Sequence, residues 1–193
     1  MKKLFILLLI FTACKKEVFH YPSKDFFKEY NPVEINVDNL NFEELTDSIR
    51  NGLYEKEHYF IEINDSNATY KISPFALTGG YIKESNGLYI INDSIGLIKG
   101  MFPINDLSKY LKLHYENNGK EYFYASSYKW AYVKLILTKE GDSEKLKTVL
   151  LNLVKIYNQT DIENKDSISL NIILDYPLEQ PALIPPPPTE YIN

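Results

Sequence analysis

The sequence has few of the residues on which common catalytic and metal sites depend. Its 193 residues include one cysteine, three histidines and one tryptophan. A single cysteine excludes any intramolecular disulfide. The histidines, His20, His58 and His114, are too widely separated to give metal-ligand spacing, and we interpret His58 and His114 as surface or helix-cap residues. Because nucleophile-elbow and phosphate-loop motifs are also absent, the sequence predicts no catalytic residue, no metal site and no cofactor.

The chain also lacks an excess of positive charge. Lys and Arg number 21 against 26 Asp and Glu, which gives a formal net charge of −5. A nucleic-acid partner is therefore not expected, because binding a phosphate backbone needs a basic surface. Hydrophobic residues make up 45% of the chain, which is enough for the core of a globular domain and argues against a disordered protein.

The first 14 residues have the pattern of a signal peptide. Lys2 and Lys3 precede an uninterrupted apolar run, Leu4–Phe11, which is followed by small residues and Cys14. Eight apolar residues are too few for a membrane span, which needs roughly 20. We therefore predict that residues 1–13 are a cleaved signal peptide. The alternative is that this run is a buried segment and Cys14 a core thiol.

The position of Cys14 resembles the lipobox of bacterial lipoproteins, in which the thiol receives a diacylglycerol and becomes the first residue after cleavage. Phe11 stands where that pattern usually has Leu, and the short signal is similar to those of Bacteroidota lipoproteins. The resemblance implies a protein attached by lipid to the cell envelope. Because no Asp follows Cys14, it implies the outer membrane, with the body facing either the periplasm or the outside. Two or more acyl chains hold a protein stably on a bilayer.

The remaining chain predicts a tether over residues 14–32, an α+β domain over 33–175 and a Pro-rich tail over 176–193. The domain is expected to have a mixed or antiparallel sheet and about three helices, with 33–85 and 86–175 as candidate subdomains of similar strand–helix–strand order. Helix-start patterns occur at Asn41, with Glu44 three residues later, at 103–106, and at Asp142 or Ser143. Apolar alternation predicts strands at 33–37, 59–63, 68–72, 88–91, 95–99, 130–138 and 167–174.

The order of elements over residues 88–174, together with the segments Phe102–Leu107 and Val149–Leu153, resembles the periplasmic domain of ExbD and TolR proteins. The resemblance implies a sheet covered by helices. That family also carries an N-terminal transmembrane helix with a proton-coupling aspartate, which residues 1–14 do not supply. No energy transduction is therefore implied.

The chain is rich in tyrosine, with 16 Tyr beside 10 Phe. One cluster of aromatic residues is the best candidate for a binding surface: Tyr122, Tyr124, Tyr128, Trp130 and Tyr132. Tyrosine suits interfaces because it combines a large apolar body with a polar tip, although the same residues could simply pack in the core. Rings exposed in a row would indicate a sugar-binding surface, and rings mixed with aliphatic side chains would indicate a protein-binding surface.

Three functional hypotheses follow from these patterns. The first is a lipid-anchored, non-enzymatic envelope protein that binds or scaffolds another envelope component. The second is a lipoprotein that binds glycan or peptidoglycan. The third is a hydrolase, which would require two of four carboxylates to meet in one pocket: Glu62, Asp65, Glu121 and Asp142. The Pro-rich tail is interpreted as a solvated extension or as a polyproline ligand for a partner.

Overall fold

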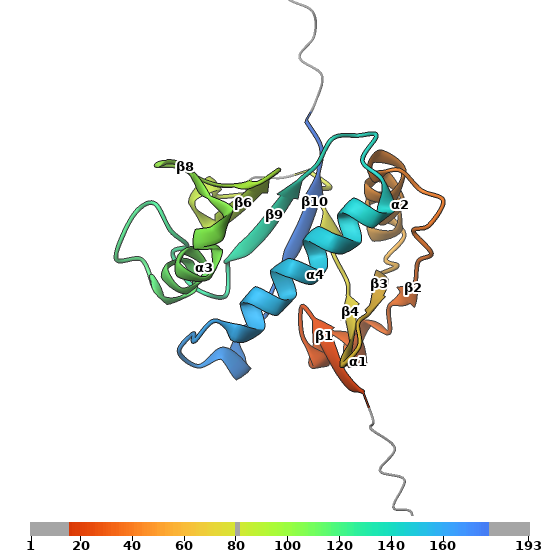
Figure 1. Cartoon of the computed structure of the whole chain (residues 1–193), viewed down its shortest axis with the longest axis horizontal. Helices are drawn as coiled ribbons and strands as arrows, with labels where there is room; N and C mark the ends of the chain where they lie inside the picture. Colours follow the sequence, from red (N-terminus) through yellow and green to blue (C-terminus); the bar gives the residue numbers. More distant parts are fainter. Residues whose placement is uncertain (1–15, 80–81, 178–193) are drawn as a thin grey trace, which may run out of the picture.

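A computed structural model describes residues 16–79 and 82–177, so residues 1–13, Cys14 and most of the Pro-rich tail lie outside the described part. The described residues form four α-helices and ten strands, which confirms the α+β class with one helix more than expected (Figure 1). The helices are α1 (Lys24–Tyr30), α2 (Phe42–Tyr54), α3 (Leu107–Glu116) and α4 (Ser143–Gln159). The strands are β1 (Glu17–Tyr21), β2 (Val33–Glu34), β3 (Tyr59–Asn64), β4 (Ala68–Ile72), β5 (Phe75–Ala76), β6 (Gly87–Ile91), β7 (Ser94–Leu97), β8 (Gly100–Pro103), β9 (Tyr132–Ile136) and β10 (Ile172–Asp175).

The strands form two mixed sheets that share one extended segment of the chain. The first sheet has the order β1-β4-β3-β2 and the second the order β5-β10-β9-β6-β7-β8. β4 continues into β5 through Ser73 and Pro74, with β1 parallel to β4 and β10 parallel to β5. Between the end of β1 and the start of β10, the Leu170 N–H donates a hydrogen bond to the Pro22 carbonyl at 3.2 Å. The two sheets are therefore joined by backbone hydrogen bonds as well as by the chain.

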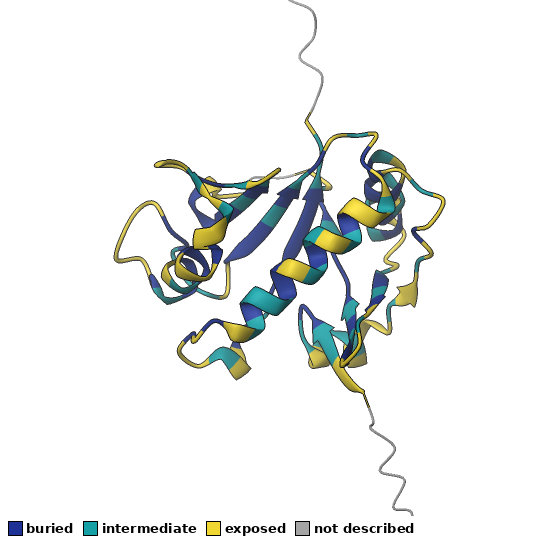
Figure 2. Ribbon diagram, viewed as in Figure 1, coloured by how far each residue is buried: buried dark blue, intermediate teal, exposed yellow. Residues whose placement is uncertain are grey.

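Helix α4 lies across one face of the six-stranded sheet and turns its buried stripe toward the strands (Figure 2). On β9, Val133 and Leu135 are fully buried, whereas Lys134 and Ile136 between them are only partly buried. This period of two places one set of side chains beneath the helix and the other set on the opposite face. The buried apolar residues form one cluster that draws on both candidate subdomains. Within residues 16–79 and 82–177, no helix is long and apolar enough to cross a bilayer.

The helix starts follow from local capping. The Asn41 side chain accepts a hydrogen bond from the Glu44 N–H, and the Glu44 carboxylate accepts one from the Asn41 N–H, each at 2.9 Å. This capping box satisfies two backbone donors at the start of α2. Asp142 caps α4 through a single bond, which its carboxylate accepts from the Lys145 N–H at 2.7 Å. Both starts agree with the sequence prediction.

Residues 17–30 differ from the predicted tether, because they form β1 and α1 on the domain. All five residues of β1 pair with β4, and Tyr21 is buried with its hydroxyl 2.7 Å from the Asn158 side chain. Phe19 stacks on Tyr70 at 5.4 Å between ring centroids. Ser23 then caps α1 by accepting from the Phe26 N–H. Aromatic burial and strand pairing thus order a segment whose charged composition is typical of a linker.

Four strands are shorter in the structure than in the sequence prediction, namely those predicted at 33–37, 95–99, 130–138 and 167–174. β2 ends at Glu34, and soon afterwards the Asn36 side chain accepts from the Asp38 N–H at 2.9 Å, which turns the chain away from the sheet. β10 begins only at Ile172, because residues 165–167 form a 3₁₀ turn that closes on Ile168. The short strands β5 and β8 were not predicted.

Candidate functional site: a hollow on the sheet face opposite α4

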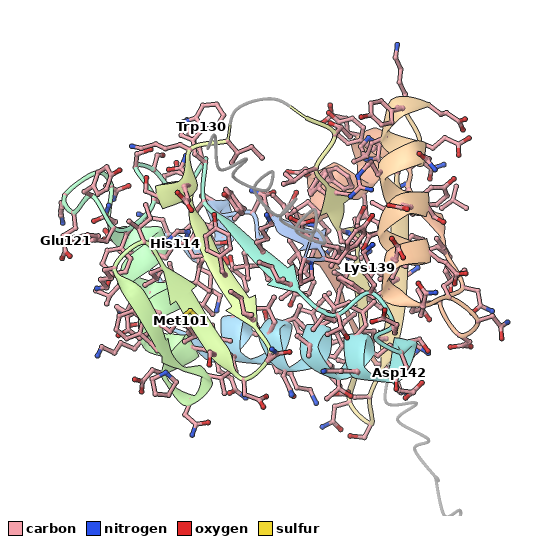
Figure 3. All side chains as sticks on the ribbon, turned by 90° about the horizontal axis from the view of Figure 1, so that it is seen from above. Met101, His114, Glu121, Trp130, Lys139 and Asp142 are labelled. Carbon is pink, nitrogen blue, oxygen red and sulfur yellow. The ribbon has the colours of Figure 1, made fainter. Side chains whose placement is uncertain are left out.

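The five predicted aromatic residues do not form an exposed row. Tyr124 and Tyr132 are buried, and Tyr128 is half-buried against the core. Tyr122 and Trp130 are exposed, at 70% and 69% of their full surface. Of the two, Trp130 lies beside a hollow, on the side of the sheet away from α4 (Figure 3).

The loop that carries Trp130 is fixed by two buried asparagines. The Asn117 amide donates to the carbonyls of Glu121 and Ala125, and its oxygen accepts from the Glu121 N–H, all at 2.8 Å. At the other side of the loop, the Asn86 oxygen accepts from the N–H and the hydroxyl of Ser126, both at 3.1 Å. Residues 117–131 lack regular structure over most of their length, yet these bonds hold the loop against the sheet.

The hollow has a volume of about 600 Å³, which is in the range of small-ligand and peptide-side-chain pockets. It lies where β5, β9 and β10 are adjacent, next to the loop that ends at Trp130. Its floor is apolar and its rim carries two lysines, Lys83 and Lys129. The lining residues come from four segments of the chain: Phe75, Ile82, Lys83, Asn86, Ser126, Lys129, Trp130, Ala131, Tyr132, Asn171 and Ile173.

A second hollow of about 390 Å³ adjoins the first, and Ile82 and Tyr132 line both. Lys134 lines this second hollow and forms an ion pair of 2.6 Å with Asp175 on the neighbouring strand. Both charged side chains are largely buried. Burial raises the pKa of the Tyr132 hydroxyl above its usual value, so the phenol stays protonated at the boundary between the two hollows. Asp175 thus neutralises Lys134, and the other charged residue that lines this second hollow is the exposed Glu84.

His114 is fully buried beneath this site, so the prediction of a surface or cap residue was wrong. Its Nε2–H donates to the Asn86 carbonyl at 3.0 Å, and its Nδ1 has no hydrogen-bond partner. Burial lowers the pKa of His114 to about 4, although the backbone of Asn86 and Tyr132 partly opposes the shift. His114 thus supports Asn86, which in turn holds Ser126 at the hollow.

The four carboxylates proposed for a hydrolase do not come together. Glu62 pairs with Lys71 at 3.6 Å on the first sheet, and Asp142 caps α4. Asp65 pairs with Lys155 at 2.7 Å, and the bonds from Lys155 and from the N–H groups of Asn67 and Ala68 lower the pKa of Asp65 to about 2. Glu121 lies exposed on the loop before Trp130. Glu62 and Asp65 thus lie on the same β3–β4 hairpin but pair with different lysines, and Glu121 and Asp142 lie on other elements.

The described residues also offer no cluster of three His, Cys, Asp or Glu side chains that could hold a metal ion. Sequence reasoning found Trp130 through the density of aromatic residues, but it missed Lys83, Asn86 and Asn171, which only the fold brings to the same place. No protein-family model, curated protein or solved structure matches the chain.

Proposed function

We propose that this chain is a lipid-anchored, non-enzymatic protein of the cell envelope that binds another envelope protein through the hollow beside Trp130. The observation that carries the binding proposal is an indole exposed to 69% beside a hollow with an apolar floor. Tryptophan is enriched among the residues that dominate binding energy at protein interfaces. The proposal of an envelope location is supported by the sequence of residues 1–14 alone.

The surroundings of Trp130 favour a protein partner over a glycan. Phe75, Ile82 and Ile173 lie in the same hollow, so the exposed ring is mixed with aliphatic and aromatic side chains rather than placed in a row of rings. A glycan remains the second candidate because the Asn171 amide and the Ser126 hydroxyl could bond to sugar hydroxyls beside the indole. The experiment below separates these two partners.

The start of β1 lies close in sequence to Cys14, which limits the distance between a lipid on that residue and the folded domain. Only two residues separate Cys14 from Glu17, so the strand would begin within roughly 10 Å of the acylated residue. Glu17 pairs with Ala68, and Phe75 of the hollow lies seven residues further along the same extended segment. At a rise of about 3.3 Å per residue, this places the hollow about 23 Å from the anchored end.

The two parts of the proposal are tested separately. For the anchor, Cys14→Ser should abolish incorporation of labelled fatty acid and move the protein from the membrane fraction to the soluble fraction. If the variant stays with the membranes and still carries label, the anchor hypothesis is wrong.

For the partner, a photo-crosslinking group is placed on the loop beside Trp130 in the full chain, and crosslinks are analysed in intact envelopes. Trp130→Ala should remove the protein crosslink, whereas Tyr122→Ala, which changes an equally exposed ring of the same loop, should retain it. Equal crosslinking by both variants would contradict the proposed site. Sedimentation with purified peptidoglycan that depends on Trp130, in the absence of a protein crosslink, would establish the glycan alternative instead.

A further inference from the structure

The hollow beside Trp130 is lined by two lysines and no carboxylate, whereas the carboxylate of Glu84 lines the adjoining hollow. Lys83 and Lys129 are exposed at its rim, and no carboxylate is among its lining residues. Neither lysine makes an ion pair with any residue in 16–79 or 82–177, whereas Lys134, Lys147 and Lys155 each lie within 2.7 Å of a carboxylate.

The floor of the hollow is apolar, in contrast to its charged rim. Phe75 and Ile173 pair across β5 and β10, and with the exposed Ile82 they form an apolar base beneath the indole. Burying such side chains on binding is favourable by roughly 25 cal/mol per Å² of apolar area, before the cost of association. A ligand that fits this site therefore has an apolar or aromatic group for the floor and negative charge for the rim.

From these two observations we infer that the hollow binds a short acidic peptide segment of the partner protein. An aromatic or aliphatic side chain of the segment packs on Trp130 and Phe75, while neighbouring Asp or Glu carboxylates pair with Lys83 and Lys129. The inference rests on the proposed function and names the chemistry of its partner. Charge complementarity and the apolar floor together favour a peptide over a neutral sugar, which would leave both ammonium groups unpaired.

The test uses random peptides displayed on phage and selected on the immobilised full chain, with depletion on the Trp130→Ala variant. Enriched peptides should combine Asp or Glu with a large apolar residue. Their binding can be followed by fluorescence, because Trp130 is the only tryptophan in the chain and reports directly on the hollow. A selection that enriches no sequence, or enriches neutral or basic ones, would overturn the inference.

The lysines are then tested with the enriched peptide and a matched control. Exposed ion pairs are weak, so Lys83→Gln or Lys129→Gln should each reduce affinity about threefold and the double variant about tenfold. The effect should shrink as salt is raised, because both side chains are exposed. Lys120→Gln removes an exposed lysine of the same loop outside the hollow and should leave affinity unchanged.

Equal affinity of the double variant and the wild type would contradict the role of the lysines. A fluorescence change with N-acetylglucosamine oligomers that is insensitive to both lysine substitutions would replace the peptide by a sugar. If the Trp130-dependent crosslink to an envelope protein persists while no acidic peptide is selected, the proposed function stands and only this inference fails.

Discussion

The burial of His114 predicts a specific loss of stability in acid. Its pKa is about 4 in the folded protein, against 6.5 for an unperturbed histidine side chain. Between these values the unfolded chain binds a proton that the folded protein does not, so the free energy of unfolding falls as the pH drops below 6.5. Each pKa unit corresponds to about 1.4 kcal/mol, so the full loss is about 3 kcal/mol at pH 4 and about 2.5 kcal/mol has gone by pH 4.5.

The assay is urea unfolding of wild type and His114→Gln at pH 7.5, 6.5, 5.5 and 4.5. Glutamine can still donate to the Asn86 carbonyl but does not titrate, so the difference between the two proteins isolates His114. Burial also lowers the pKa of His20 and His58, and their contributions cancel in that difference. We expect the stability advantage of wild type over the variant to decrease by about 2.5 kcal/mol between pH 7.5 and 4.5. Parallel curves over this range would refute the assignment of a buried, neutral His114.

Two further substitutions test how the ends of α4 and β6 are stabilised. Lys165→Met should lower the free energy of unfolding by about 1–3 kcal/mol, because the ammonium group bonds to the carbonyls of Tyr157, Asn158 and Thr160 at the end of α4. Urea titration measures this loss, with Lys145→Met, at an exposed position of the same helix, as the control. Gly87→Ala should lower the melting temperature and shift the fluorescence emission of Trp130, because the new Cβ would lie 2.8 Å from the ring of Tyr132 and push that ring toward the hollow. An unchanged spectrum and melting curve would show that the Tyr132 ring leaves room for a side chain at position 87.

Short-range features of this fold could be predicted from sequence because the residues that decide them are neighbours. Asn41 and Asp142 start α2 and α4 through side chains that reach only three residues along the chain. The β3–β4 hairpin follows from alternation on both sides of a polar turn. β1 was missed because its order depends on a parallel neighbour about 50 residues away, and five residues without clear alternation in a charged segment do not show that pairing.

The misinterpretation of His114 had a different origin, since its burial was visible in the spacing. It follows Leu107 by seven residues and Leu111 by three, so it lies on the buried stripe of α3. Sequence reasoning gave the polar character of His114 more weight than its position on this stripe, and so assigned the residue to the surface or to a helix cap. The hollow could not be found in this way, because its floor, its rim and its indole come from segments that no local period connects.

The geometry of the sheets also bears on which partner can reach the hollow. The described chain begins and ends at opposite ends of the molecule (Figure 1), and Lys16 already bonds to the Asp65 carbonyl at 2.8 Å. With lipid on Cys14, ordered structure would therefore begin close to the bilayer, and the continuous segment from Ala68 to Phe75 would set the height of the hollow. If this segment runs along the membrane normal, the hollow would lie about 23 Å from the anchored end, whereas the headgroup layer of one leaflet is only about 5–8 Å thick, half the difference between the whole bilayer and its hydrocarbon core. The acidic groups proposed to pair with Lys83 and Lys129 would then come from a protein above the membrane rather than from a lipid within it.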